Sequence, residues 1–315
     1  LMALALCMTL LPTAALAEGE TIKEVNSAPE LKNAIETGSN SIVKLTADIE
    51  ISTTLTVSRA VPLDLNGNVL KRTDTGRVIE VQNNGNLTLT DSTPSATHSF
   101  KVDESTKLWI LDKTNGTNTV NGGVITGGNA NANNNDGGGV IIVSGGTFTM
   151  TGGNIVGCTA GSGGGVDVSG TFTMTGGSIA GCVAAHASGG GVYVVLYATL
   201  DLSGTARISG NYACAVDYKE SATFGGGVYV AGTFDMRGGE ICDNFAGLAN
   251  YKNKYGNDDR RGGDGGGVYL YSKSSFSMSG GSIQDNTVDD RGGGVFVRGY
   301  DHTITCLLYT SDAAD

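Results

Sequence analysis

The stretch that decides the fold reads Gly163-Gly164-Gly165-Val166-Asp167-Val168-Ser169-Gly170-Thr171-Phe172-Thr173-Met174-Thr175-Gly176-Gly177-Ser178-Ile179. Its opening, three glycines and a valine, occurs six times, starting at Gly137, Gly163, Gly189, Gly225, Gly265 and Gly292. The first two intervals between these triplets are both 26 residues. Self-similarity at a fixed period predicts a repeat protein in which each unit stacks on the next.

Apolar and polar residues alternate within one repeat, as where Val166 and Val168 flank Asp167. A period of two indicates β-strands, and the glycines between them supply turns. Each repeat therefore holds about three short strands, near Val166, Phe172 and Ile179. Three strands and three turns complete one coil, which predicts an all-β fold, a parallel β-helix.

Equivalent apolar side chains are expected to stack inside the coil, one above the next. The expected columns are Val140, Val166, Val192, Val228, Val268 and Val295; Phe148, Phe172, Phe234 and Phe276; Met150, Met174, Met236 and Met278; and Ile155, Ile179, Ile208, Ile241 and Ile283. A disordered segment is the alternative for a chain with 50 glycines in 315 residues. Disordered segments lack apolar residues in phase, so the columns favour the solenoid.

A polar column lies three residues past the isoleucines. Its members are Cys158, Cys182, Asn211, Asn244 and Asn286. An inward asparagine at a corner can hydrogen-bond the turn backbone and the next side chain of the ladder, so that no buried polar group is left unpaired. We expect the two cysteines to be packed free thiols, with a disulfide between them as the alternative.

The two ends of the chain differ from the repeat. Residues 1–17 have the apolar run and the Ala15-Leu16-Ala17 site of a signal peptide, without its basic start. Residues 306–315 match the translation of a sequencing-library adapter, so the natural protein is expected to continue past Thr305. Residues 18–305 are then a single β-helix domain.

The first coils are expected to be irregular. A short helix over Ser27 to Gly38, with a capping box of Ser27 and Glu30, is predicted to cover the open end of the stack. The strands predicted for these coils span 42–45, 55–57, 62–65, 78–81, 87–89 and 108–111.

These phrases resemble those of the right-handed parallel β-helix proteins with a pectate-lyase-like fold. More narrowly, the chain is similar to the secreted or surface, adhesin-like β-helix repeat proteins of gut-type bacteria. Segments 225–230, 170–179 and 63–67 carry the resemblance, which covers about residues 20–304. It implies a right-handed coil. It leaves activity open, because such families include polysaccharide lyases and hydrolases as well as non-catalytic proteins.

One candidate binding surface is an aromatic stripe. Tyr193, Tyr229, Tyr269 and Phe296 each follow the first strand valine, so they should point away from the core as an exposed ladder. A row of flat rings fits the apolar face of a sugar chain. The alternative is that the rings only pack on one another across the sheet.

A second candidate is the corner where the repeats differ in length. The two longest insertions lie between residues 211 and 225 and between 244 and 265, and the second carries Tyr251 and Tyr255. Insertions on one side often mark the working face of a solenoid. The alternative is a solvated loop without a ligand.

Signals for a metal or for catalysis are weak. Asp258 and Asp259 could form a weak Ca²⁺ site with Asp289 and Asp290 one coil later, although solvated charge is the preferred interpretation. The three histidines fit no metal spacing. We therefore assign no catalytic residue, metal ligand or cofactor.

The formal net charge of −11 argues against nucleic acid and anionic membranes as partners. The expected function is that of a non-catalytic rod, secreted or on the cell surface, that binds polysaccharide or another surface glycan or protein. The alternatives are a polysaccharide lyase or glycoside hydrolase, and a structural spacer within a larger surface protein.

Overall fold

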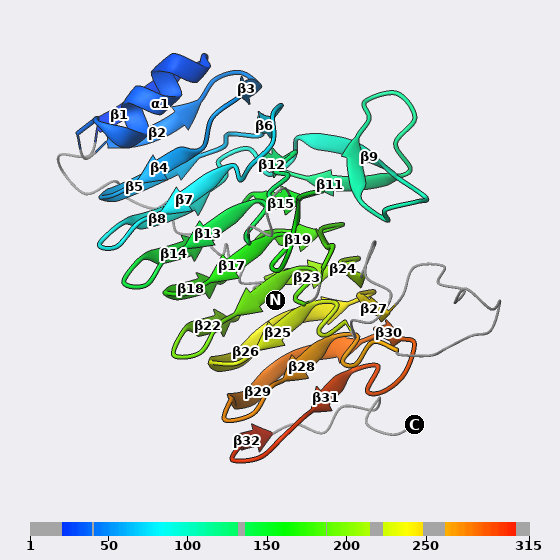
Figure 1. The fold of residues 1–315 in the computed structure, drawn as a ribbon. Helices are drawn as coiled ribbons and strands as arrows, with labels where there is room; N and C mark the ends of the chain where they lie inside the picture. The colour runs from blue at the N-terminus through cyan, green and yellow to red at the C-terminus, as the bar shows by residue number, and fades with distance from the viewer. Residues whose placement is uncertain are drawn as a thin grey trace, which may run out of the picture.

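The protein is a parallel β-helix with one short helix at its N-terminal end (Figure 1). The computed structural model describes residues 21–39, 41–131, 136–186, 188–214, 223–247 and 262–306. Three parallel sheets form the sides of the coil, and the coils follow one another along its axis. The predicted fold class is confirmed.

The eight-stranded sheet holds the strands that follow the glycine triplets and their counterparts in the first coils. Its members are β4 (Leu55–Val57), β7 (Ile79–Val81), β13 (Val140–Ile142), β17 (Val166–Val168), β21 (Val192–Val194), β25 (Val228–Val230), β28 (Val268–Leu270) and β31 (Val295–Val297).

The sixteen-stranded sheet has two limbs that merge in the last coils. Its first limb holds β1 (Thr21–Val25), β2 (Ser41–Leu45), β5 (Ala60–Asp64), β8 (Asn86–Thr90), β14 (Thr147–Met150), β18 (Thr171–Met174), β22 (Thr199–Leu202) and β32 (Thr303–Cys306). Its second limb holds β3 (Ile49–Ile51), β6 (Val69–Arg72), β12 (Val124–Thr126), β15 (Asn154–Val156), β19 (Ser178–Ala180) and β23 (Arg207–Ser209). The long strands β26 (Thr233–Cys242) and β29 (Ser275–Gln284) run through both limbs.

The five-stranded sheet was not predicted from the sequence. It holds β16 (Thr159–Ala160), β20 (Val183–Ala184), β24 (Tyr212–Cys214), β27 (Phe245–Gly247) and β30 (Thr287–Val288). Its strands have two or three residues, which is too short to show a period of two. The three strands predicted near Val166, Phe172 and Ile179 are confirmed as β17, β18 and β19.

The predicted columns form one continuous core. Phe148 and Phe172 stack with ring centroids 4.8 Å apart and planes 4° apart, and Leu200 takes the next position in register. The valine, methionine and isoleucine columns are buried in the same core, except that Val295 in the last coil is partly exposed.

Glycine is required where the chain turns from the five-stranded into the eight-stranded sheet. Gly163 has a φ of +60°, which side chains resist, and a Cβ on Gly164 would lie 2.5 Å from the Val183 carbonyl oxygen. The triplets therefore let neighbouring coils approach closely at this corner.

The predicted asparagine ladder is confirmed. The Asn211 side-chain amide donates to Asn244 Oδ1 at 2.9 Å, and the Asn244 amide donates to Asn286 Oδ1 at 2.9 Å. Each amide also donates to a strand carbonyl of the preceding coil. Cys158 and Cys182 continue this column as free, fully buried thiols, as expected.

The N-terminal helix covers the first coil, but its cap differs from the predicted one. Helix α1 spans Ala28–Glu36 and packs against β1 to β4, with Leu31 and Ile35 fully buried in the core. The capping box is wrong, because the Ser27 side chain makes no cap hydrogen bond. Glu30 instead accepts from the Asn26 backbone N–H at 3.2 Å.

The prediction that 108–111 belongs to a coil is also wrong. Strand β10 (Trp109–Leu111) pairs antiparallel with β9 (Thr97–Val102), which also pairs with β11 (Asn118–Asn121). This three-stranded flap packs on the outer face of the second limb through Phe100, Val124, Val156 and Ala180. The Trp109 backbone N–H donates to the Gly181 carbonyl at 3.1 Å, and a Cβ on Gly181 would lie 2.0 Å from the Trp109 ring.

Truncating one ring of the core column should destabilise the whole coil. We expect Phe172→Ala to lower the free energy of unfolding by about 3–5 kcal/mol, because the stacked neighbours cannot close the cavity. Thr173→Ala, on the same strand but facing outward, should change it by about 0.5 kcal/mol or less. Urea denaturation measures both, and equal losses would contradict the inward stack.

Candidate functional site

The predicted aromatic stripe exists as a stack of rings on the outer side of the eight-stranded sheet. Ring centroids are 4.7 Å apart for Tyr193 and Tyr229, 5.3 Å for Tyr229 and Tyr269, and 5.6 Å for Tyr269 and Phe296. The interplanar angles are 14°, 11° and 26°. The four residues are paired in register on β21, β25, β28 and β31, so the parallel ladder itself sets the ring spacing.

The expectation that this stripe is exposed is wrong for its middle. Tyr269 is 0% exposed and Tyr229 is 8% exposed. Phe224 lies with its ring 4.5 Å from that of Tyr269 and contributes to the same cluster. Rings stacked at this distance bury apolar area against one another, so the stack is a second, smaller core outside the coil.

Exposed tyrosines lie instead in the turns that lead into the sixteen-stranded sheet. Tyr271 is 46% exposed and stacks on Tyr229 at 6.1 Å, while Tyr197 is 92% exposed and Tyr300 is 66% exposed. We call these three residues the tyrosine edge. They were not predicted, because turn residues follow no strand period, although their position just after the valine strands is visible in the sequence.

Tyr197 occupies an unfavourable backbone conformation. It has a φ of 69° in a turn closed by the Ala198 N–H and the Val195 carbonyl. The equivalent turns place Asn84, Gly145 and Lys273 at this position, all with positive φ. Asparagine and glycine tolerate positive φ, whereas a tyrosine or a lysine there is uncommon. Tyr197 is also almost fully exposed, and a strained, exposed aromatic residue points to a functional reason.

Two arginines lie at the C-terminal end of the ring stack. Arg291 makes two hydrogen bonds of 3.0 Å to the buried Asp264 carboxylate, and its guanidinium lies 5.0 Å from the Phe296 ring centroid. Arg298 lies 5.6 Å from the Phe224 ring centroid. The neighbouring Tyr269 hydroxyl raises the pKa of Arg298. The ion pair with Asp264 and the contact with the Phe296 ring hold the Arg291 guanidinium, and cation–π contact with Phe224 holds that of Arg298.

Two carboxyl groups lie at the other end of the stack. In the eight-stranded sheet Asp167 lies between Ile141 of the preceding coil and Tyr193 of the next coil. It is 3% exposed. Burial, with a smaller contribution from the negative charge of Asp136, raises the pKa of Asp167 to about 7. Burial also raises the pKa of Asp136, whose Oδ1 accepts from the Ser162 N–H at 3.0 Å. This pair could not be predicted from the sequence, because the two residues are 31 positions apart.

The predicted loop residues cannot be placed. Tyr251, Tyr255, Asp258 and Asp259 lie outside the described residues. Their expected Ca²⁺ partner Asp290 is 3.4 Å from Arg291 Nε. Among the described residues, no group of three or more His, Cys, Asp and Glu side chains could hold a metal ion. Nor is any described helix long and apolar enough to cross a membrane.

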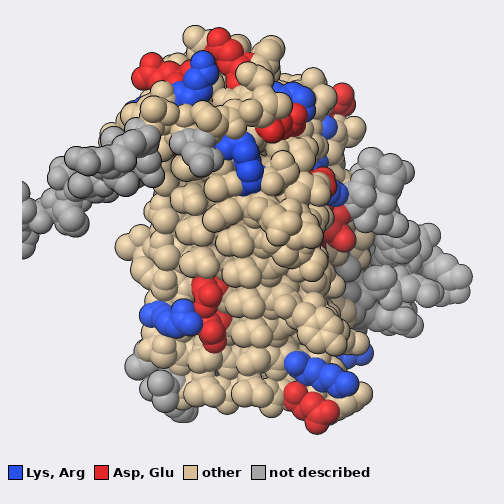
Figure 2. Space-filling model, turned by 90° about the vertical axis from the view of Figure 1, so that its left-hand side faces the viewer, with Lys and Arg blue, Asp and Glu red and all other residues tan. Residues whose placement is uncertain are grey.

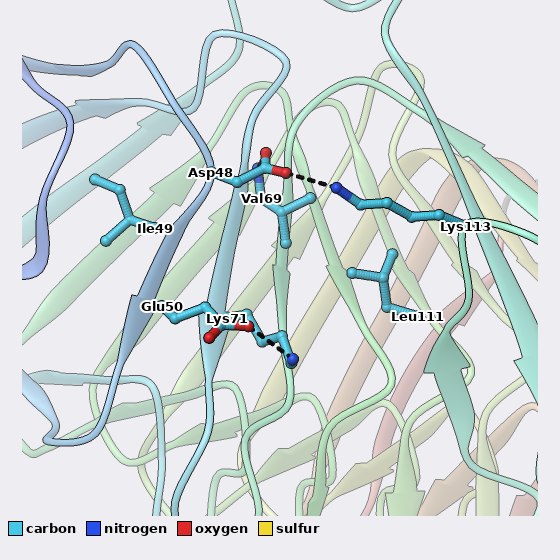
Figure 3. A pocket seen from close by; sticks show the side chains of 7 residues that line it. All are labelled: Asp48, Ile49, Glu50, Val69, Lys71, Leu111 and Lys113. Carbon is cyan, nitrogen blue, oxygen red and sulfur yellow. Dashed lines mark hydrogen bonds and ion pairs between the residues drawn. The ribbon is translucent and has the colours of Figure 1, made fainter.

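A small cavity lies between the flap and the edge of the first coils (Figure 3). Its volume is about 250 Å³, and it is lined by Asp48, Ile49, Glu50, Val69, Lys71, Leu111 and Lys113. Lys113 pairs with Asp48 and Lys71 with Glu50, each at 2.9 Å. Both ammonium groups are thus neutralised within the chain, and the cavity offers a ligand no uncompensated charge.

In comparisons with known proteins, no family model matches this chain, and no curated protein or solved structure does either. The geometry identifies a parallel β-solenoid and assigns no family. Since a fold of this kind hosts many functions, function has to be argued from the site.

The buried carboxyl pair predicts an unusual pH dependence of stability. Because the folded pKa of Asp167 is raised from 3.8 to about 7, the folded state holds its proton longer than the unfolded state. Stability should therefore fall as pH rises from about 4 to about 7, by at most roughly 4 kcal/mol.

Asp167→Asn should remove most of this fall, measured by chemical denaturation from pH 4 to pH 8. Asp136→Asn should remove a smaller part, and Asp301→Asn, at an exposed position, should leave the profile unchanged. A profile in Asp167→Asn identical to that of the unmodified protein would show that the carboxyl is solvated.

Proposed function

We propose that this protein is a non-catalytic β-helix rod, secreted or held at the cell surface, that binds carbohydrate through the tyrosine edge. The observation that carries the proposal is that Tyr197 and Tyr271 expose 92% and 46% of their surface in equivalent turns, Tyr197 with a strained backbone. The signal-peptide pattern of residues 1–17 supports export.

The edge has the properties that sugar recognition needs. Tyr271 rests on Tyr229, whose ring is clamped between Tyr193 and Tyr269, so its orientation is supported by the stack. A ring supported in this way offers a flat apolar face at low entropic cost on binding. The phenol hydroxyls add hydrogen-bonding groups at the rim.

The turn lengths leave space between the two rings. Residues 195–198 join β21 to β22 and residues 271–274 join β28 to β29, whereas only Ala231 and Gly232 join β25 to β26. Tyr197 and Tyr271 therefore project from long turns on either side of a short one. A chain of sugar rings crossing the short turn would contact both tyrosines.

An alternative function, cleavage of a polysaccharide, has one observation in its favour. Asp167, with a pKa of about 7, is a carboxylic acid that stays protonated near neutral pH, as a general acid requires. Asp167 and Asp136 are both largely buried, so a substrate would have little access to their carboxyl groups, which favours the binding function.

An enzymatic assay distinguishes binding from cleavage. The protein is incubated with a panel of polysaccharides and assayed for new reducing ends and unsaturated products. Cleavage that is lost in Asp167→Asn would establish the enzyme.

Removing the tyrosine edge should weaken glycan binding. We expect Tyr197→Ala combined with Tyr271→Ala to lower the affinity for glycans identified on an array by about tenfold or more, since about 1.4 kcal/mol is lost with the two ring contacts. The melting temperature should change little, because both rings are exposed.

Ile110→Ala provides the control, since Ile110 is an exposed apolar residue on the flap, away from the edge. Its binding should equal that of the unmodified protein. If the double tyrosine variant bound glycans as well as the unmodified protein, the tyrosine edge would not be the binding site.

A further inference from the structure

A regular field of threonines covers the outer face of the first limb. Threonines and one serine occupy most of the outward positions of β8, β14, β18, β22 and β26, together with the residue after each of β14, β18 and β22: Thr88, Thr90, Thr147, Thr149, Thr151, Thr171, Thr173, Thr175, Thr199, Ser203 and Thr233. The other outward positions of these strands on the first limb hold Asn86, Asp201, Asp235 and Arg237. Thr147, Thr171 and Thr199 are partners in register, and so are Thr88, Thr149 and Thr173. We call this field the threonine lattice.

The lattice repeats in two directions, along the rod and along each strand, and it lies on a tightly packed core. Along the rod its rows follow the spacing of hydrogen-bonded strands, about 4.8 Å, and along each strand outward residues recur at about 6.6 Å. Beneath it Phe148 and Phe172 stack almost parallel in the core. Because packed interiors resist deformation, the hydroxyl and methyl groups above them are held at fixed positions.

The outward positions of β8, β14 and β18 carry no charged residue, and charged residues lie on both sides of this part of the face. At one margin Arg237 pairs with Asp201 at 3.1 Å and with Asp235 at 3.3 Å, and at the other Lys44 lies 3.8 Å from Asp64. Figure 2 looks at this side of the rod and shows a broad uncharged area between charged groups. In a chain with a net charge of −11, such an area selects an uncharged partner.

Most of the lattice hydroxyls remain available for a partner. The hydroxyls of Thr90 and Thr151 donate to carbonyl groups of the preceding coil at 3.4 Å. Within the described part of the chain, the hydroxyls of Thr149, Thr171 and Thr173 have no hydrogen-bond partner, and all three residues are partly or fully exposed. Each offers a donor beside a methyl group.

We propose that the threonine lattice binds the surface of a crystalline, N-acetylated polysaccharide, that is, chitin. The chains of this solid stack through N–H···O=C hydrogen bonds between their acetamido groups. The same kind of amide hydrogen bond sets the distance between neighbouring β-strands. The spacing of chains in this solid and the spacing of coils in the rod are therefore close to each other. Each coil then faces one polysaccharide chain.

The chemical groups of the two surfaces also match. A threonine offers an O–H donor and a methyl group, and an acetamido group offers a carbonyl acceptor and a methyl group. Single contacts of this kind are weak, but a rigid lattice repeats them in register, so that after the first contact the others form at high effective concentration. The lattice should therefore hold the insoluble solid much better than short soluble fragments.

This inference is independent of the tyrosine edge, which lies in the turns beside the lattice. Unchanged soluble-glycan binding in the double tyrosine variant would refute only the proposed edge. Unchanged chitin binding in the lysine variant of the lattice would refute only the lattice.

The experiment is a sedimentation assay of the full chain with crystalline chitin, crystalline cellulose and soluble chitin hexamer, at low and at high salt. The unmodified protein should sediment with chitin at both salt concentrations, since no charge takes part, and at least tenfold less with cellulose. Excess hexamer should compete poorly.

Thr149→Lys combined with Thr173→Lys should lower chitin binding at least tenfold, because two charges then face an uncharged solid. Thr149→Val with Thr173→Val, which keeps shape and methyl groups but removes the hydroxyls, should lower it by a smaller factor. Thr287→Lys, on the exposed strand β30 of another sheet, should bind normally.

Circular dichroism separates loss of binding from loss of folding, and the valine variant preserves a test if the lysine variant does not fold. Equal binding by all variants, equal retention on cellulose, or shaping of ice crystals without retention on chitin would overturn the proposal.

Discussion

The parallel main-chain ladder between successive coils is the constraint on which the rest of this structure depends. It places Phe172 directly over Phe148 and Tyr229 directly over Tyr193, because partners in a parallel ladder share one spacing. Inside the coil this makes apolar columns, and at the corner it makes the asparagine ladder. Outside the coil it makes ordered rows of side chains, which form extended surfaces.

The two outer faces use the same ladder for different purposes. On the eight-stranded sheet the outward rings bury one another, with Tyr269 fully covered and arginines held at one end. On the first limb the outward threonines Thr149, Thr171 and Thr173 remain partly exposed. Large rings gain apolar burial by stacking, whereas threonines keep their hydroxyls hydrated. The first face is therefore mainly structural, and recognition is assigned to its exposed rim and to the threonine lattice.

Much of the fold could be read from the repeat, because each inward residue recurs in phase. The five-stranded sheet escaped detection since a strand such as Val183–Ala184 is too short to show a period. The flap escaped detection since Trp109 lies within a segment that looks like another coil. Of the site, the direction and stacking of the four rings were predicted correctly. Their burial was not, because alternation tells which side a ring points to and not what lies above it.

The sequence by itself determined the solenoid, its columns and the corner glycines, because these follow from periods of two and about 26 residues within a single chain. Tertiary structure alone decided which outward residues are covered, where the flap docks, and that the charge of Asp136 acts on the buried Asp167 carboxyl. Those contacts join segments from different coils and different sides of the coil, at sequence separations that no local pattern encodes. Their energies depend on burial, which exists only once the coils are stacked.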